Sequence, residues 1–226
     1  MRRIDSIGAL LSEHLSFPGT TVVDVGCGTG ELVRWLVRQG ATVTGVDNPS
    51  MLARAQAQPP AGAERYLAGG GETLPLPDRH ADLLIYAASL HHVPAERLRE
   101  AVAECARVLR PGGQAAFVEP VAEPGSYYDI TRLTGDEAEI QRLAYAAILE
   151  APAVGLELVS EGRFYISRSF ADYQHLVAVF VEDEERRAEC LARAGEETER
   201  RAVQAGITFA DVRYRSICRL NLLRRA

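Results

Sequence analysis

The chain has 226 residues, which is long enough for one α/β domain with additions and short for two independent hydrophobic cores. Hydrophobic residues make up 47% of it and charged residues 25%, so a largely disordered chain is excluded. The formal net charge of -6 argues against a surface that follows a nucleic-acid backbone, and it favours a small-molecule partner.

The cysteines are scattered and form neither a disulfide framework nor a Cys-x-x-Cys motif; they are Cys27, Cys105, Cys190 and Cys218. The first residues lack the charged, apolar and small-residue order of a signal peptide, and no apolar run approaches the ~20 residues of a membrane span. We therefore expect a cytoplasmic protein with no membrane span, no metal site and no nucleic-acid partner. The oligomeric state is left open, with a homodimer as one possibility.

The first half of the chain alternates between predicted helices and strands. Apolar residues at helical spacing predict helices over residues 4–15, around 32–37 and over 95–109. Apolar and β-branched runs predict strands at residues 21–25, 41–46, 65–68, 81–87 and 114–119. Asn48 is placed to cap a helix that begins at Pro49. This alternation favours a doubly wound parallel sheet with helices on both faces.

After Pro120 the pattern changes. We expect a loop over residues 121–128, a helix over 134–149, a strand over 156–169 with a turn at Glu161-Gly162, and helices over 171–181 and 183–205. A last strand over 207–223 should pair antiparallel with the strand near residues 163–168.

A glycine cluster, Asp24-Val25-Gly26-Cys27-Gly28-Thr29-Gly30, follows the first of these strands and opens a helix. Glycines there let a ligand reach backbone N–H groups that a side chain would block. A dinucleotide loop would need glycine at position 31, which is Glu31, and this carboxylate would repel a pyrophosphate but not a cationic sulfonium ligand. Asp47, after the next strand, is placed to accept the hydroxyls of a ribose.

These segments resemble the class I S-adenosylmethionine-dependent methyltransferases (methyltransferase type 11), most closely the small-molecule branch that includes the ubiquinone and menaquinone C-methyltransferases. The matching stretches, in family order, are residues 22–30, 45–47, 72–75, 82–93 and 107–113. The resemblance implies a Rossmann-like, doubly wound, mostly parallel seven-stranded sheet with helices on both faces, an antiparallel last strand and a helical insertion after the fifth strand. It also implies methyl transfer from S-adenosyl-L-methionine to an O, N or C atom of a small-molecule acceptor by in-line displacement, with S-adenosyl-L-homocysteine as product.

The resemblance implies one domain over residues 1–226, with a cofactor-binding half at 1–120 and helical elements at 121–155 and 170–206 that cover the substrate. The cofactor-binding residues it implies are Asp24, Gly26, Cys27, Gly28, Gly30, Asp47, Asn48, Gly71, Glu72 and Ser89. Cys27 is expected to be a packed residue and not a nucleophile.

One departure from the family concerns the adenine contact. The family often has Gly-Asp-Ala before its Glu-x-Leu-Pro segment, whereas this chain has Gly69-Gly70-Gly71-Glu72. With Gly70 in place of the aspartate, Glu72 or a backbone carbonyl could contact the adenine amino group. The alternative is a flexible turn with no such contact.

A general base is needed only when the acceptor is protonated at rest, as a phenol or an alcohol is. His91 and His92 follow the fourth strand and Glu119 ends the fifth, all at the edge where ligands of such sheets bind. We expect His91 and Glu119 to act together as a catalytic pair that provides a general base, and we expect His92 to contact the substrate. The alternative is that either histidine caps or packs against the following helix.

Tyr127 and Tyr128 are the other expected substrate-binding residues. Because neighbours in an extended segment point opposite ways, only one of them should face the acceptor, while the other docks the inserted helix.

Two other functions stay open. An RNA or protein methyltransferase is disfavoured, since the chain has no basic patch and no Asn/Asp-Pro-Pro-Tyr segment after the fourth strand. A non-catalytic S-adenosylmethionine-binding module is the other alternative, which only turnover on an acceptor would separate from an enzyme.

Overall fold

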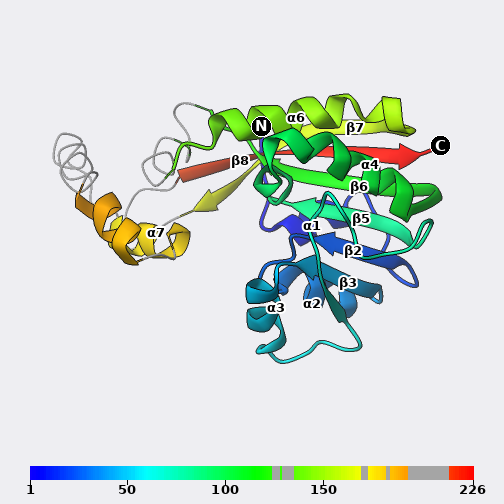
Figure 1. Cartoon of the computed structure of the whole chain (residues 1–226), viewed down its shortest axis with the longest axis horizontal. Coiled ribbons are helices and arrows are strands. Elements are labelled where there is room, and N and C mark those ends of the chain that lie inside the picture. Colours follow the sequence, from blue (N-terminus) through cyan, green and yellow to red (C-terminus); the bar gives the residue numbers. More distant parts are fainter. Residues whose placement is uncertain (124–127, 129–134, 169–172, 182–183, 193–213) are drawn as a thin grey trace.

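A computed structural model of the chain describes residues 1–123, 128, 135–168, 173–181, 184–192 and 214–226 (Figure 1). These residues build an eight-stranded sheet in the order β1-β7-β8-β6-β5-β2-β3-β4. The strands are β1 (Arg2–Arg3), β2 (Thr21–Val25), β3 (Thr42–Asp47), β4 (Arg65–Ala68), β5 (Ala81–Ala87), β6 (Leu109–Pro120), β7 (Leu156–Arg168) and β8 (Tyr214–Arg225). β2 to β6 run parallel, β8 is antiparallel to β6 and β7, and β1 is parallel to β7.

This arrangement confirms the predicted mostly parallel, doubly wound sheet with an antiparallel last strand. The strand number differs, because Arg2 and Arg3 add a short eighth strand by pairing with Phe164 and Tyr165 of β7. Two residues carry no hydrophobic period, so sequence patterning could not indicate this strand.

Two predicted strand boundaries also differ. β6 begins at Leu109 and not at residue 114, since Leu109 already pairs with Ala81 before a register irregularity brings Gln114 opposite Leu83. β7 runs on without the expected turn at Glu161-Gly162, and its irregularity is a register shift between Leu158 and Ser160. A strand with a bulge stays paired along its length, whereas a turn would have ended it.

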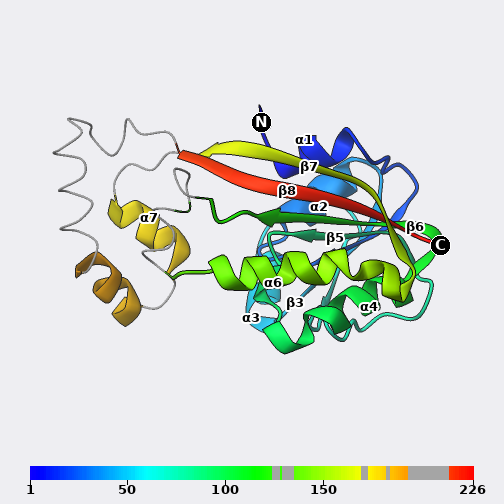
Figure 2. The same ribbon diagram turned by 90° about the horizontal axis from the view of Figure 1, so that it is seen from above.

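Helices cover both faces of the sheet (Figure 2). Buried residues of α4 (Leu98–Val108) and α6 (Ala138–Leu149) pack on one face, with Tyr86 stacked on Phe117 at a centroid distance of 5.3 Å. Buried residues of α1 (Ile7–Ser12), α2 (Glu31–Arg38) and α3 (Pro49–Gln56) pack on the other face. Three 3₁₀ helices join these elements: η1 (Leu90–His92), η2 (Ala95–Arg97) and η3 (Ala151–Val154).

Capping decides where the first helices begin. The Ser6 side chain accepts the Ala9 N–H and caps α1, so the helix begins at Ile7. The N–H of Ile4 instead donates to Tyr165 O of β7, which explains why the helix predicted over residues 4–15 is shorter in the structure. The Asn48 side chain accepts the Met51 N–H with Pro49 in the first turn of α3, which confirms the predicted cap.

Further helices lie past the end of the sheet. α7 (Tyr173–Phe180) and the helical residues 184–192 lie beyond the carboxyl ends of the parallel strands, next to the end of β7 and the start of β8 (Figures 1 and 2). β8 pairs antiparallel with β7 as predicted, with Arg163 opposite Arg219. No helix within the described ranges is long and apolar enough to cross a membrane.

Candidate functional site

The glycine loop connects β2 to α2 at the carboxyl edge of the sheet, where the parallel strands end. Gly26, Gly28 and Gly30 have φ angles of 71°, 55° and 76°, in the left-handed region that favours glycine. A Cβ on Gly26 would lie 2.4 Å from Cβ of Ser89, so this glycine permits close packing inside the protein. A Cβ on Gly28 would meet nothing within 4 Å, so the backbone there faces open space.

Asp47 is fixed against this loop. Its Oδ2 accepts the N–H of Gly28 at 2.7 Å, and its Oδ1 accepts the N–H of Asn48 at 2.7 Å. Each carboxylate oxygen keeps a further lone pair, so both can still accept a hydroxyl. Asn48 itself uses its side chain to cap α3.

Asp24 is buried near the end of β2, next to the glycine loop. It is 1% exposed, and neither carboxylate oxygen has a hydrogen-bond partner among the described residues. Burial, with a smaller contribution from the charge of Asp47, raises the pKa of Asp24 to about 7. A buried carboxylate that lacks donors is costly, and a positive ligand group brought close to it would offset this cost.

Cys27 packs inside the loop. Burial, and then the charges of Asp24 and Asp47, raise the pKa of the Cys27 thiol far above its usual range, so the thiol stays neutral. Its sulfur would lie 2.8 Å from a Cβ on Gly45, which places it against β3. Both observations agree with a packing residue.

His91 and Glu119 meet at the same edge. His91 Nδ1 lies 2.6 Å from Glu119 Oε2, and both residues are 6% exposed. Burial alone would lower the pKa of His91, but the hydrogen bond and charge of Glu119, with the charge of Glu137, raise it. The Glu119 carboxylate also accepts the N–H groups of Ser89 at 3.0 Å and Leu90 at 2.9 Å, so it orders the loop as well as the imidazole.

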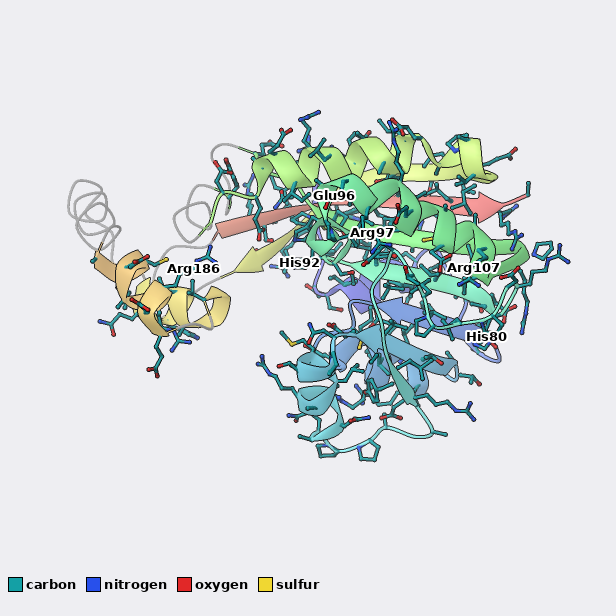
Figure 3. All side chains as sticks on the ribbon, in the orientation of Figure 1. His80, His92, Glu96, Arg97, Arg107 and Arg186 are labelled. Carbon is teal, nitrogen blue, oxygen red and sulfur yellow. The ribbon has the colours of Figure 1, made fainter. Side chains whose placement is uncertain are left out.

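His92 and Glu137 lie on the open side of His91. The rings of His91 and His92 are 4.2 Å apart between centroids, and Glu137 Oε2 lies 3.9 Å from His91 Nε2. Burial and the neighbouring His91 lower the pKa of His92. Figure 3 shows His92 near the carboxyl edge, with His80 and Arg107 toward the opposite end of the sheet.

Sequence reasoning missed Glu137. It lies at the start of α6, and no local pattern indicates that this helix brings its first residues to His91.

The turn at Gly71 and Glu72, where we expect the adenine contact, is fixed by hydrogen bonds from other parts of the chain. Glu72 Oε1 accepts a hydrogen bond from Arg97 Nη1 at 3.1 Å, so this side chain is ion-paired. Gly71 O accepts the hydroxyl of the buried Tyr86 at 3.2 Å, and a Cβ on Gly71 would lie 2.6 Å from that hydroxyl oxygen. The turn is therefore anchored by Tyr86 and Arg97.

Ser89 also lies against the glycine loop, where its hydroxyl donates to Val25 O at 2.6 Å. Tyr128 donates its hydroxyl to Asp136 Oδ1 at 3.0 Å, and the same oxygen accepts the N–H of Ala138 at the start of α6. Tyr128 thus contacts the segment that leads into the inserted helix. Tyr127 lies outside the described residues.

The matches to known proteins fall on the part of the chain that builds this edge. Residues 23–117 match the family model described as a methyltransferase domain. Over these residues the chain carries a methyltransferase domain.

Two curated relatives of this methyltransferase domain are identified by name. The malonyl-[acyl-carrier protein] O-methyltransferase of Pectobacterium atrosepticum is 38% identical over 110 residues, which cover 48% of this chain and 41% of that protein. The chloroplastic 2-methyl-6-phytyl-1,4-hydroquinone methyltransferase of Arabidopsis thaliana is 35% identical over 116 residues, which cover 50% of this chain and 34% of that protein. The methyltransferase domain therefore spans less than half the length of these relatives.

The fold has counterparts among solved structures. An S-adenosylmethionine-dependent methyltransferase from Mesorhizobium loti superposes with a TM-score of 0.58 at 21% identity, covering 96% of each chain. At this identity the likeness shows a shared fold.

The residues present fit S-adenosyl-L-methionine, the cofactor that the resemblance implies. S-adenosyl-L-methionine carries a positive ammonium group, a positive sulfonium and a ribose diol. The carboxylate of Asp24, which has no hydrogen-bond partner in the described part of the chain, supplies a negative charge for these groups. The open backbone at Gly28 supplies free space, and the two ordered oxygens of Asp47 supply acceptors.

Proposed function

We propose that this methyltransferase domain binds S-adenosyl-L-methionine at the glycine loop and transfers its methyl group to an O, N or C atom of a small-molecule acceptor. The observation that carries the proposal is the buried carboxylate of Asp24, which accepts no hydrogen bond from any described residue and lies at the same edge as the loop. A cationic ligand supplies a positive counter-charge for this buried carboxylate, whereas a pyrophosphate would be repelled by it.

The proposed cofactor contacts divide among the ends of four strands of the sheet, β2, β3, β4 and β5. Asp24, near the end of β2, and the loop residues Gly26, Cys27, Gly28 and Gly30 after it hold the methionyl part, while Asp47 at the end of β3 accepts the ribose hydroxyls. Ser89, after β5, fixes the loop through its bond to Val25 O. Gly71 and Glu72 border the adenine, and the Arg97 ion pair leaves Glu72 with one oxygen for that contact.

When bound, S-adenosyl-L-methionine supplies an activated methyl group, whose carbon a nucleophile attacks in line with the departing sulfur, so that S-adenosyl-L-homocysteine leaves. His91 then accepts the proton of a protic acceptor at Nε2, because Nδ1 is engaged by Glu119. Glu119 is a positioning residue that holds the imidazole and stabilises its protonated form. His92 is exposed beside His91 and is proposed to contact the acceptor.

The acceptor side is proposed to be covered by the helical elements over residues 121–155 and 170–206, in one domain with the cofactor-binding half at 1–120. Arg186 belongs to the helical residues 184–192 and is labelled in Figure 3. A Cβ added to Gly135, which lies just before α6, would be 3.3 Å from Nη2 of Arg186. The two covering elements thus approach each other closely at that point, which supports a common cover over His91 and His92.

Calorimetry tests the first half of this proposal. The protein should bind S-adenosyl-L-methionine and S-adenosyl-L-homocysteine saturably and should not bind NAD. Tighter binding of NAD would end the proposal.

Turnover tests the second half. The protein should release S-adenosyl-L-homocysteine in the presence of some members of a panel of phenols, carboxylates and amines. Binding without turnover on any acceptor would favour a non-catalytic S-adenosylmethionine-binding module, and turnover on RNA or protein alone would favour the macromolecular alternative. The cytoplasmic location and the homodimer stay predictions, to be tested by fractionation and light scattering.

A further inference from the structure

Three side chains at the carboxyl edge bring metal-binding atoms together. His91, His92 and Glu137 each offer one ligand atom, and these atoms all lie within 4.8 Å of one another. Two of them come from η1 and the third from the start of α6, so the cluster joins the sheet edge to the inserted helix.

The buried member of the cluster is arranged as a ligand. Histidines that bind metals usually donate their other ring N–H to a carboxylate, which fixes the tautomer and the direction of the free nitrogen. Glu119 Oε2 lies 2.6 Å from Nδ1 of His91, and the carboxylate is itself held by backbone N–H groups. This leaves Nε2 of His91 as the free nitrogen, on the side of Glu137.

We propose that His91, His92 and Glu137 form a binding site for a divalent transition-metal ion, with Zn²⁺ as the best match. Two imidazole nitrogens and one carboxylate oxygen are a ligand set that zinc takes in open sites, where water or another ligand fills the fourth position. The nearby carboxylate of Glu119 adds negative charge that favours a cation.

The spacing requires a small adjustment. Ligands of a tetrahedral zinc ion lie about 2.0–2.2 Å from it, and hence roughly 3.4 Å from one another. His91 Nε2 and Glu137 Oε2 are 3.9 Å apart, so this pair must close by about 0.5 Å. All three ligand atoms lie within 4.8 Å of one another, so the exposed His92 must adjust as well wherever its nitrogen lies beyond the zinc spacing. The Glu137 side chain is half exposed and lies at a helix end, so it can move while His91 stays in place.

The ion and the acceptor proton would compete for one nitrogen. Nε2 of His91 cannot accept a proton while it binds a metal, so zinc should inhibit any turnover that depends on His91 as a base. The metal site does not depend on the proposed methyl transfer, because binding of the ion can be measured in the absence of both S-adenosyl-L-methionine and the methyl acceptor.

The test is a titration of chelator-treated protein with Zn²⁺ by calorimetry, and with Co²⁺ by visible absorption, which reports a tetrahedral site directly. We expect one equivalent of each ion to bind. His92→Asn and Glu137→Gln change exposed side chains, so they should keep the fold, and each should lower the Zn²⁺ affinity at least about 10-fold.

Matched controls separate this site from adventitious binding to surface residues. Glu139→Gln changes an exposed carboxylate of the same helix that is paired with Arg142, and His80→Asn changes a histidine near the opposite end of the sheet (Figure 3). Both controls should bind Zn²⁺ like the unaltered protein. No saturable binding, or an affinity that the two ligand variants leave unchanged, would overturn the proposal.

Discussion

The carboxylate of Glu119 lies 2.6 Å from Nδ1 of His91 and at the same time accepts the N–H groups of Ser89 and Leu90. One buried side chain therefore orders both the loop after β5 and the imidazole on it. A change at Glu119 can act through the loop or through the imidazole, and substitutions must distinguish the two effects.

His91→Ala should lower turnover by about 10²-fold or more and leave cofactor affinity near that of the unaltered protein, because a positioned base typically contributes this much. Steady-state rates with a protic acceptor, together with calorimetry for S-adenosyl-L-homocysteine, make the measurement. A small loss in both quantities would instead favour a packing role for His91.

Glu119→Gln separates orientation from loop order. The amide oxygen can still accept the Ser89 and Leu90 N–H groups, but an amide NH₂ facing Nδ1 requires a proton at Nε2 of the neutral imidazole. We expect kcat to fall by about 10²-fold while the protein still folds, since the wrong tautomer removes the base. If kcat is unchanged, the orientation of His91 does not matter for turnover.

Asp47→Ala should weaken S-adenosyl-L-methionine binding by about 2–4 kcal/mol, since hydrogen bonds to a charged group are worth roughly 1.5–3 kcal/mol each and are not additive. The substitution also removes the acceptor of the Gly28 and Asn48 N–H groups, so part of the loss comes from a less ordered loop. Calorimetry on both proteins checks this, and an unchanged affinity would place the ribose elsewhere.

Gly28→Val and Gly26→Val should differ in what they damage. A side chain on Gly28 enters open space, so this variant should lose cofactor affinity more than thermal stability, although its φ of 55° adds strain. A side chain on Gly26 meets Ser89 at 2.4 Å, so that variant should mainly lower Tm. Thermal unfolding and calorimetry on both variants make the comparison, and equal losses of Tm would contradict it.

Asp24 predicts a pH dependence of binding. With a pKa of about 7 in the folded protein, Asp24 is largely protonated below that pH, and a cationic ligand favours its ionised form. Affinity for S-adenosyl-L-methionine should rise between about pH 5 and pH 7 and then level off, with a proton released on binding in that range.

The same shift has a consequence for stability. Between about pH 4 and pH 7 the folded protein holds a proton on Asp24 that the unfolded chain has lost, so the contribution of Asp24 to stability falls as the pH rises. Asp24→Asn removes the group and should flatten both profiles. Profiles that keep their slope in this variant would assign the titration to another residue.

Much of the sheet and its edge followed from sequence because strand ends carry the signals. The glycines after β2, the acid that ends β3, His91 after β5 and Glu119 near the end of β6 each lie where a parallel strand stops, and such ends meet at one edge. The start of β6 could not be predicted in this way, since Pro111 and Gly112 are typical of turns yet lie within a paired strand. Glu137 could not be predicted either, because its place depends on how α6 packs.

The position of β8 bears on how the chain can acquire its structure during synthesis. β7 and the two-residue β1 reach the rest of the sheet only through β8 among the described pairings, since β8 lies between β7 and β6. The parallel strands β2 to β6, which carry the glycine loop, can pair before β8 has left the ribosome, whereas β7 has to wait for it. A nascent chain that stops before Tyr214 should therefore hold an ordered β2–β6 layer with an open β6 edge, a state that exposes strand backbone to other chains.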